Sequence, residues 1–423
     1  MKILALILAG GRVNELDVLT LHRPKSAVPF GGLYRIIDFA LSNLMHSGIN
    51  LVGVLSQYRS DSLIHHVGTG AAWDFIGRKR GVHFLPPSQG TRSSNWYRGT
   101  ADAVYQNLDF IDWHAPDKVL ILSGDHIYKM DYQNLIQFHN DHNSDLTISF
   151  VKRPHEEGSR FGLAHFDDEA DDNGGKLIGY DEKPETPGSN WASMTVYLFN
   201  TPVLRKVLQQ CEKNGTDHFG KDIIPGMIDK YNVYGYKFHD TWAYTQTLDE
   251  YWQANMELLK QHPLLDIKKW QLRTNLENEN IRDRVPTQFG ANAKIKNSFV
   301  YSGSKILGKV ENSIIFPGVD IGQNAMVKDS VLFYDAKIQE NATLDKTILD
   351  VRVNVGANTR IGFGKADTPN RRYPKLLTSG ITIVGRDAKI PSDIKISKNC
   401  IIGPALSKKD FTRDFYATGE YIE

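Results

Sequence analysis

Apolar runs and amphipathic stretches alternate along the first 251 residues of the chain. Four runs have the length and apolar composition of buried strands, at residues 3–9, 51–56, 119–123 and 146–151. Longer stretches with apolar residues at helical spacing lie at residues 36–47, 100–111 and 132–140. Strands that alternate with helices predict an α/β fold with a mainly parallel, Rossmann-like sheet that is covered on both faces. Ligands of such sheets bind at the carboxyl ends of the strands.

A different pattern begins after residue 251. Residues 252–262 have helical spacing, and residues 263–286 are polar and irregular, which is typical of a linker. From residue 289 onward, small or β-branched residues recur in short pairs about every six residues. Examples are Ala293/Ile295, Val319/Ile321, Ala325/Val327 and Ala336/Ile338.

This repeat predicts a parallel β-helix, in which each coil buries its apolar side only by stacking on its neighbours. The repeat is interrupted at residues 364–380 and continues after them. An ordinary β-sandwich is the alternative. We therefore expect a first domain over residues 1–262, a linker over 263–288 and the β-helix over 289–423.

The composition disfavours several classes of protein. The 50 Lys and Arg residues nearly balance the 49 Asp and Glu residues, so no overall field would attract nucleic acid or an anionic membrane. The two cysteines, Cys211 and Cys400, lack the spacing of a metal site or a disulfide framework. The apolar run at residues 3–9 ends in two glycines and fits a buried strand better than a signal peptide, and no later run is long enough to span a membrane. We therefore expect a cytoplasmic protein.

The first candidate for chemistry directly follows the first apolar run, in the segment LAGGR. Gly10 and Gly11 allow backbone N–H groups to approach a ligand, and a following helix start would favour a phosphate. Arg23 and Lys25 supply two cations a short loop away, and lysine suits phosphate as a compact point charge. A simple tight turn and a solvated Lys25 are the alternatives.

Four further segments carry candidate residues. In the motif WYRGTADAV, Gly99 would permit close approach, and Thr100 would cap a helix whose N-terminus faces a ligand. Asp125 follows the third apolar run, which makes it a candidate Mg²⁺ ligand, although it could merely cap the next turn. The charged segments at residues 181–184 and 217–222 are weaker signals, because each is also typical of a solvated cluster.

In this order, the five segments resemble the sugar-nucleotide pyrophosphorylases, in particular the bacterial ADP-glucose pyrophosphorylases, or glucose-1-phosphate adenylyltransferases. The resemblance covers nearly the whole chain, and its most specific parts are RIIDFALSN at residues 35–43 and WYRGTADAV at residues 96–104. It implies a nucleotidyltransferase domain followed by a left-handed parallel β-helix. It also implies that ATP and glucose 1-phosphate give ADP-glucose and pyrophosphate for glycogen biosynthesis, with Mg²⁺ as cofactor.

The resemblance implies site residues position by position. The catalytic roles fall to Lys25, which would face phosphate, and to Asp125, which would hold the metal. Nucleotide contacts are expected at Leu8, Ala9, Gly10, Gly11, Gln57, Trp96, Gly99, Thr100 and Ala101. Contacts to the sugar phosphate are expected at Tyr97, Gly162, Glu182, Lys183 and Ser193.

The resemblance also implies partners and regulation. The family is tetrameric and allosteric, with effectors bound between the catalytic domain and the β-helix. We therefore expect a homotetramer, or a heterotetramer with a paralogous subunit, and no nucleic-acid or membrane partner. Candidate effector contacts are Arg35, Arg371 and Arg372, of which the last two lie where the coils are interrupted.

The chain departs from the family pattern at the chemistry itself. The family reads GGRGTRL where this chain reads GGRVNEL, so Val13 replaces a glycine and Glu15 replaces a phosphate-facing arginine. A carboxylate near a triphosphate repels it unless the loop is reshaped. Tyr244 stands where the family has an aspartate that serves as the second metal ligand, and Asp240 could supply a carboxylate in its place. Thr195 replaces a glycine near the sugar pocket.

Three hypotheses follow from these departures. The chain is an active adenylyltransferase with a modified metal and phosphate site, or it is a catalytically impaired regulatory subunit that works with a catalytic partner. The third hypothesis is a structural β-helix scaffold without catalysis. The retained Asp125 and Lys183 disfavour the third hypothesis.

Overall fold

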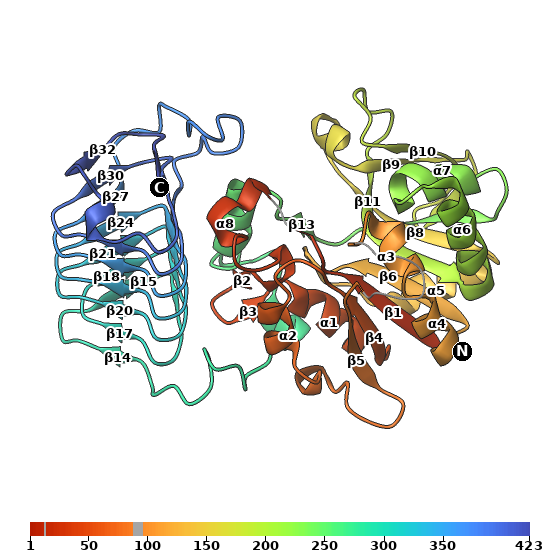
Figure 1. Cartoon of the computed structure of the whole chain (residues 1–423), viewed down its shortest axis with the longest axis horizontal. Coiled ribbons are helices and arrows are strands. Elements are labelled where there is room, and N and C mark those ends of the chain that lie inside the picture. Colours follow the sequence, from red (N-terminus) through yellow and green to blue (C-terminus); the bar gives the residue numbers. More distant parts are fainter. Residues whose placement is uncertain (12–13, 88–95) are drawn as a thin grey trace. The chain divides into compact units, whose positions relative to one another are not determined.

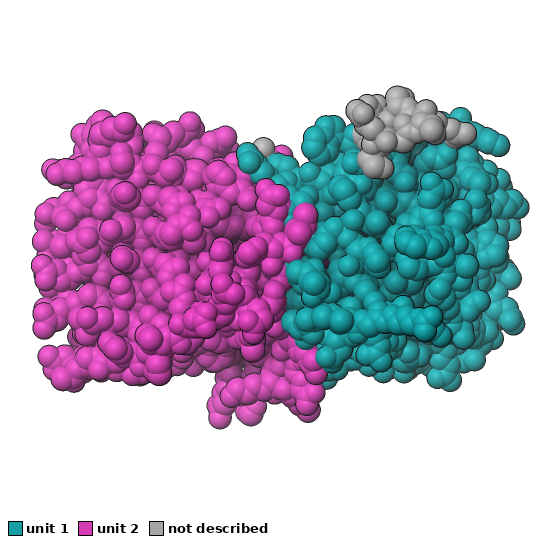
Figure 2. Space-filling model, turned by 60° about the horizontal axis from the view of Figure 1, so that its bottom comes forward, with its two compact units in different colours: residues 1–11, 39–60, 67–242 teal, residues 12–38, 61–66, 243–423 magenta. Residues whose placement is uncertain are grey.

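The computed structural model of the chain describes residues 1–11, 14–87 and 96–423. Its contacts form two compact units, which have different colours in Figure 2. Unit 1 comprises Met1–Gly11, Phe39–Ser60 and Val67–Trp242, and unit 2 comprises Arg12–Asp38, Asp61–His66 and Ala243–Glu423. By their contacts, two N-terminal segments therefore belong to the same unit as the C-terminal part of the chain. The domain bounds expected from the sequence stay a prediction.

Unit 1 contains a sheet of nine described strands in the order β5-β4-β1-β6-β11-β8-β12-β10-β9 (Figure 1). Their bounds are β1 (Ile3–Leu8), β4 (Leu51–Leu55), β5 (Gly81–Leu85), β6 (Lys118–Ser123), β8 (Leu146–Lys152), β9 (Gly162–Phe166), β10 (Gly174–Glu182), β11 (Trp191–Asn200) and β12 (Val233–Phe238). The N-terminal strands β5, β4, β1 and β6 are parallel, whereas β11 runs antiparallel between β6 and β8. The four predicted strands are confirmed to within one residue as β1, β4, β6 and β8.

Helices pack on this sheet and form the core with it. Their bounds are α1 (Ile37–His46), α3 (Thr100–Tyr105), α4 (Leu108–His114), α5 (Tyr132–Asp141), α6 (Thr201–Asn214) and α7 (Ile224–Met227). The predicted helices at residues 36–47 and 132–140 are confirmed as α1 and α5, whereas the single helix predicted at residues 100–111 is wrong. It is two helices, because Asn107 turns its side-chain amide back onto the Ala103 carbonyl at 2.8 Å and interrupts the helical ladder.

Unit 2 is built around a parallel β-helix of three sheets, whose coils are stacked in Figure 1. The first sheet contains β14 (Gln288–Phe289), β17 (Lys305–Ile306), β20 (Asp320–Ile321), β23 (Lys337–Ile338), β26 (Asn354–Val355) and β29 (Lys389–Ile390). The second contains β15 (Lys294–Lys296), β18 (Lys309–Glu311), β21 (Met326–Lys328), β24 (Thr343–Asp345), β27 (Arg360–Phe363), β30 (Lys395–Ser397) and β32 (Phe415–Tyr416). The third contains β16 (Phe299–Val300), β19 (Ile314–Ile315), β22 (Val331–Leu332), β25 (Thr347–Leu349), β28 (Thr382–Val384), β31 (Ile401–Ile402) and β33 (Tyr421–Ile422).

The predicted left-handed parallel β-helix is confirmed, and its strands pair in parallel from coil to coil. Asp320 pairs with Lys337, and Lys337 pairs with Asn354, so these two coils each have 17 residues, whereas the coil from Lys305 to Asp320 has 15. The next pair joins Asn354 to Lys389, and the additional residues between them include the predicted interruption. Inward-pointing residues such as Val327 are fully buried and form one continuous apolar core.

Asparagine residues form the corners of successive coils. Asn324, Asn341 and Asn358 have φ angles of 56°, 58° and 59°, in the left-handed region that asparagine tolerates better than most residues. Their side chains also form a ladder, because Asn324 donates to Asn341 at 3.3 Å and Asn341 donates to Asn358 at 3.1 Å. The turn residues between the apolar pairs therefore determine how the coils close.

Replacing Asn341 by alanine is expected to lower the free energy of unfolding by about 1–2 kcal/mol, because alanine loses the ladder and strains the left-handed corner. Asn341→Gly is the matched control, since glycine loses the same hydrogen bonds but adopts the corner freely. We expect the glycine variant to lose less than half as much stability in chemical denaturation. Equal losses in the two variants would show that backbone strain contributes nothing at this corner.

Segments from both halves of the sequence belong to unit 2 together with the β-helix. Their elements are the 3-10 helices Asn14–Leu19 and Lys25–Ala27, β2 (Pro29–Phe30), β3 (Tyr34–Arg35), α2 (Asp61–Val67), α8 (Leu248–Glu257) and α9 (Ile267–Trp270). The helix predicted at residues 252–262 begins earlier, because Thr247 and Glu250 form a capping box that starts α8. The predicted linker is not wholly irregular, because it contains α9. In the described ranges, no helix combines the length and the apolar character that crossing a membrane requires.

Candidate active site

The glycine loop after β1 packs against Gln57. A Cβ atom at Gly10 would lie 3.3 Å from the backbone nitrogen of Gln57, so a side chain at this position would be crowded. The amide of Gln57 in turn pairs with the backbone of Tyr97: Tyr97 N–H donates to Oε1 at 2.8 Å, and Nε2 donates to the Tyr97 carbonyl at 3.2 Å. The structure thus brings together three predicted nucleotide or sugar-phosphate residues. Arg12 and Val13, the next residues of the motif, lie outside the described residues.

The parallel pairing of β1 with β6 places Asp125 beside this loop. Leu8, the last residue of β1, is in register with Ser123, and the N–H of Gly124 donates to the Leu8 carbonyl at 2.9 Å. A Cβ atom at Gly124 would lie 2.7 Å from Ile7, so the close approach of the chain after β6 to β1 requires glycine. Asp125 follows immediately, as expected for a ligand-binding residue at the carboxyl end of a strand.

Two neighbours orient the Asp125 carboxylate, whose side chain is 25% exposed. The Ser123 hydroxyl donates to its Oδ1, and Nε2 of His126 lies 3.5 Å from the same oxygen. His126 begins β7 (His126–Tyr128), and its other ring nitrogen, Nδ1, lies 3.1 Å from the Met194 carbonyl. The ring is therefore fixed between β11 and the carboxylate.

This donor set fits a divalent cation that arrives with a nucleotide. No group of three or more His, Cys, Asp and Glu side chains that could hold a metal occurs in the described residues. Asp240 is exposed and accepts a hydrogen bond from its neighbour, Thr241. Mg²⁺ commonly binds through one or two carboxylates plus substrate phosphates, so Asp125 can supply the protein ligand and the phosphates the others.

The start of α3 differs from the expectation in one respect. Thr100 is not the N-cap, because Gly99 occupies that position and Thr100 is the first helical residue. The N–H groups of Ala101 and Asp102 donate to the Asp217 carbonyl at 2.9 Å and 3.3 Å, so this carbonyl already occupies the helix N-terminus that was expected to face a ligand. Trp96 is 70% exposed, and the residues just before it lie outside the described ranges.

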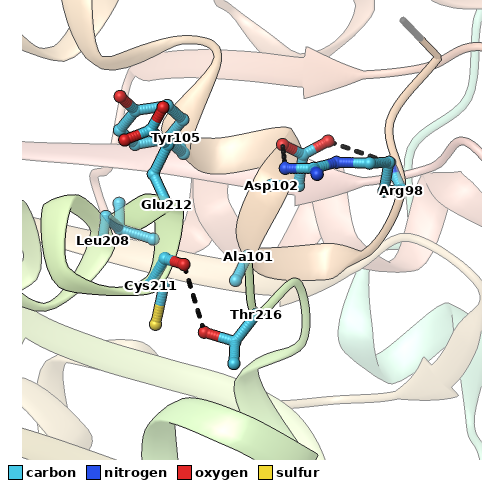
Figure 3. A pocket seen from close by; sticks show the side chains of 8 residues that line it. All are labelled: Arg98, Ala101, Asp102, Tyr105, Leu208, Cys211, Glu212 and Thr216. Atoms are coloured by element: carbon cyan, nitrogen blue, oxygen red, sulfur yellow. Dashed lines mark hydrogen bonds and ion pairs between the residues drawn. The ribbon is translucent and has the colours of Figure 1, made fainter. Parts of the chain in front are cut away.

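A small pocket opens between α3 and α6 (Figure 3). It is lined by Arg98, Ala101, Asp102, Tyr105, Leu208, Cys211, Glu212 and Thr216. Its volume of about 10 Å³ holds about one water molecule, which is far too little for a nucleotide or a sugar phosphate. Burial raises the pKa of the Cys211 thiol, so this cysteine is not an activated nucleophile. We assign no ligand to this pocket.

The predicted sugar-phosphate residues meet at the ends of β9 and β10. Glu182 is in register with Gly162, and the Tyr180 hydroxyl donates to Glu182 Oε2 at 3.0 Å. A Cβ atom at Gly162 would lie 1.8 Å from the Tyr180 hydroxyl oxygen, so only glycine fits there. Ser193 on β11 is within hydrogen-bonding reach of the Tyr180 hydroxyl, and Lys183, which is exposed, follows Glu182 directly.

Within unit 2, three arginine side chains lie near one another. Arg23 is 4% exposed, and its Nη2 donates to Asp350 at 2.8 Å, so it belongs to this cluster rather than to the glycine loop. Arg35 is 8% exposed and donates to the carbonyls of Ala27 and Ser62, both at 3.2 Å. Burial lowers the pKa of Arg35, and the charges of Arg23 and Arg386 lower it further. We call Arg23, Arg35 and Arg386 the arginine cluster.

The other two predicted effector residues lie on the 364–380 interruption and are exposed. The guanidinium of Arg372 is 4.4 Å from the Tyr421 ring centroid and donates to Glu423 at 3.3 Å. The N–H of Arg371 donates to the Gly419 carbonyl at 2.8 Å. These contacts fix the interruption on the last coil of the β-helix.

Comparisons with known proteins agree with this geometry. The nucleotidyl transferase family matches residues 4–261, and the family described as GlmU-like, C-terminal hexapeptide, matches residues 284–384. The chain is 40% identical to the glucose-1-phosphate adenylyltransferase of Acetivibrio thermocellus over 97% of this chain and 95% of the relative. It is 40% identical to the Thermotoga neapolitana enzyme of that name over 100% of this chain and 98% of the relative. The chain belongs to the glucose-1-phosphate adenylyltransferase family.

A third relative of that name, from Clostridium novyi, is 46% identical over 77% of this chain and 84% of the relative. Membership of the glucose-1-phosphate adenylyltransferase family confirms the resemblance inferred from the motifs, and the enzyme class with it. Nucleotidyl transferases of this family generally use a divalent metal. The single oriented carboxylate of Asp125 agrees with that use.

The residues that depart from the adenylyltransferase pattern contact one another or its motifs. Lys25 is 1% exposed, and its Nζ lies 5.0 Å from the centroid of the Tyr244 ring, which replaces the family's aspartate. Glu15, which replaces an arginine, accepts a hydrogen bond at 3.4 Å from the side chain of Gln246, which replaces a glycine. The two altered segments therefore contact each other within unit 2.

Two groups of residues were missed by the sequence reasoning. Tyr180 and Tyr197 link the sugar-phosphate residues through their hydroxyl groups, but tyrosines in strands usually indicate core packing. Asp350 and Arg386 join Arg23 only through the fold, at separations of 327 and 363 residues along the chain. No local pattern could have identified them.

Proposed function

We propose that this chain transfers the adenylyl group of ATP to glucose 1-phosphate and releases pyrophosphate, in the synthesis of an α-glucan such as glycogen. The observation that carries this proposal is the adjacency of two strand ends. The glycine loop follows β1, and Asp125 follows β6, and these strands pair in parallel with their last residues in register. A nucleotide on the loop would therefore present its phosphates to the carboxylate.

The proposed reaction needs positioning and charge neutralisation more than covalent chemistry by the protein. An oxygen of the sugar phosphate forms a bond to the α-phosphorus of ATP in line, while the bond from that phosphorus to the bridging oxygen breaks. Its electron pair leaves with pyrophosphate. We assign the approach to the nucleotide to Gly10 and Gly11, and the contact with the sugar phosphate to Lys183. Mg²⁺, held by Asp125, would neutralise the phosphate oxygens.

Lys25 has a more indirect part in this proposal than the motif alone predicted. Its ammonium group is buried over the Tyr244 ring, a cation–π contact that is worth about 2 kcal/mol or more when it is desolvated. We propose that Lys25 reaches a phosphate only when this contact is exchanged for one with the nucleotide. The exchange would weaken ATP binding relative to a chain in which Lys25 is already in place.

The proposed location, assembly and regulation of the protein rest on its family and on arginine residues of unit 2. We propose a cytoplasmic tetramer, made of one kind of subunit or of two. We also propose that an anionic effector binds at the arginine cluster, because its three guanidinium groups lie near one another and the other two lower the pKa of Arg35, while Asp38, Asp350 and Asp387 neutralise them in part. Arg35 would contribute only after releasing its two carbonyl partners, whereas Arg371 and Arg372 would form an exposed second contact.

A second candidate is a regulatory subunit of the same enzyme, with little activity of its own. Tyr244 and Glu15 favour it, since a phenol is a poor Mg²⁺ ligand and a carboxylate repels a triphosphate. Pyrophosphate release from ATP and glucose 1-phosphate separates the two candidates. We expect release by the purified chain alone. Release only after a catalytically competent family member is added, above that member's own rate, would favour the regulatory subunit.

Replacing Lys183 by glutamine is expected to raise KM for glucose 1-phosphate by about tenfold and to change kcat less, because a charged contact made in both ground and transition states is lost. Lys176→Gln is the matched control, since Lys176 is an exposed lysine on the same strand, β10. Steady-state kinetics with each substrate varied in turn measures both constants. A KM change confined to ATP would show that the assignment of Lys183 is wrong.

A further inference from the structure

Thr195 has a backbone conformation that its side chain disfavours. Its φ angle is 53°, in the left-handed region, where a β-branched residue is a steric outlier. Among the residues that the structure describes, it is the only β-branched residue with a positive φ angle. Most of the others are Asn or Asp, which tolerate this region. Strain of this kind persists where the surrounding structure enforces it, often at functional sites.

The strained residue lies in a bulge of β11. The register of β11 against β8 runs from Ser193 opposite Phe150 to Tyr197 opposite Ile148, so β11 has two additional residues in this interval. Bulges of this kind redirect side chains next to active sites. This bulge borders both halves of the candidate site, because the Met194 carbonyl bonds to His126 next to Asp125, while Ser193 and Tyr197 face the sugar-phosphate residues.

Thr195 is connected to Glu182 by a chain of hydroxyl groups. The Tyr197 hydroxyl is within hydrogen-bonding reach of the side chains of Thr195, Ser193 and Tyr180, and Tyr180 donates to Glu182 at 3.0 Å. The Thr195 N–H also donates to Ser193 Oγ at 3.3 Å. Burial raises the pKa of Tyr197 to about 12, so this phenol keeps its proton at neutral pH.

The protons of this chain point in one direction. Each phenol has a single proton, so Tyr180, which donates to Glu182, can only accept from Tyr197 or Ser193. A Tyr197 hydroxyl that donates to Tyr180 can in turn only accept, and the hydroxyl groups of Ser193 and Thr195 are its available donors. Glu182 at the far end is exposed, and its carboxylate lies against Gly220, where a Cβ atom would be 2.2 Å from its Oε2. The orientation of the carboxylate thus depends on the hydroxyl chain.

We infer that Thr195 is a positioning residue of the sugar-phosphate site. Its hydroxyl fixes the chain through Tyr197 and Tyr180 to Glu182, and its strained backbone is retained because it directs that hydroxyl to Tyr197. The inference rests on the proposed function, and it gives a role to a departure from the family pattern that otherwise adds only bulk.

Three substitutions separate the hydroxyl from the strain. Thr195→Gly removes both, Thr195→Val removes the hydroxyl and keeps the β-branched strain, and Thr195→Ser keeps the hydroxyl. We expect the glycine and valine variants to raise KM for glucose 1-phosphate by about three- to tenfold, with KM for ATP unchanged and the serine variant near the wild type. The glycine variant should also unfold at a temperature about 2–4 °C higher, and the valine variant should not.

The result that would overturn the inference is a glycine variant with higher thermal stability and an unchanged KM for glucose 1-phosphate. The strain would then have no role in the site. If the wild type forms no ADP-glucose, the proposed function fails, and calorimetric titration with glucose 1-phosphate tests Thr195 separately. Weaker binding to the glycine and valine variants than to the wild type and the serine variant supports the inference, and equal binding contradicts it.

Discussion

Replacing Asp125 by asparagine is expected to lower kcat by about a hundredfold or more, while ATP binding persists, because the metal stabilises charge mainly in the transition state. Asparagine has nearly the same shape and keeps an oxygen that accepts from the Ser123 hydroxyl, so the turn after β6 should be unaffected. Pyrophosphate release under saturating substrates gives kcat, and calorimetric titration with ATP and Mg²⁺ gives the affinity.

The control for this variant is Asp109→Asn, which removes an exposed carboxylate from α4 in the same unit. It should leave kcat and the unfolding temperature unchanged. Near-normal turnover by Asp125→Asn would remove this carboxylate from the mechanism. A loss of folded protein, detected by circular dichroism, would instead show that Asp125 mainly caps the turn, which was the structural alternative for this residue.

The second large effect is expected from restoring the family's residues at two positions. Glu15→Arg and Tyr244→Asp should each tighten binding of ATP with Mg²⁺ by about tenfold or more, because each restores a charged contact worth about 1–3 kcal/mol. Both positions lie in unit 2, where Glu15 contacts Gln246 and Tyr244 lies under Lys25. Tyr244→Asp also replaces the π face beside Lys25 by a carboxylate, and this stronger partner for the ammonium group opposes part of the gain.

The double variant should gain more than the sum of the two single variants, because the arginine and the metal would hold one triphosphate together. Tyr244→Phe is the matched control, since it keeps the ring under Lys25 and adds no charge, and it should bind ATP as the wild type does. Titration calorimetry and pyrophosphate release on all five proteins decide the question. A wild type that is already fully active, with a double variant that is worse, would contradict the impaired-subunit hypothesis.

The regular elements were predictable because each depends on a short-range pattern. The strand β1 and the coil strand β20 were recognisable from a few neighbouring residues, since a buried strand needs an apolar run and a coil needs its inward pair. The boundary of α8 was missed, although Thr247 and Glu250 have the spacing of a capping box. The break before Asn107 depends on one side chain that bonds to its own helix, and the overall periodicity does not reveal it.

The candidate site was predictable only where a motif carries it. Gly10, Gln57 and Tyr97 were named from separate segments, and the structure brings them into contact. The burial of Lys25 was not predictable, because its partner Tyr244 is more than two hundred residues away in the sequence. The arginine cluster and the hydroxyl chain to Glu182 also need the fold, since they join residues from different strands and loops.

The proposal that this chain is an adenylyltransferase is tested most directly by the stoichiometry of its products. The purified chain would be incubated with ATP, Mg²⁺ and glucose 1-phosphate, and the nucleotide sugar and the pyrophosphate would both be quantified. In-line attack on the α-phosphorus predicts one ADP-glucose for each pyrophosphate, with neither product formed when glucose 1-phosphate is omitted. Two results would contradict the account: consumption of ATP without ADP-glucose, or no turnover by the chain alone together with no increase over the own rate of a catalytically competent family member.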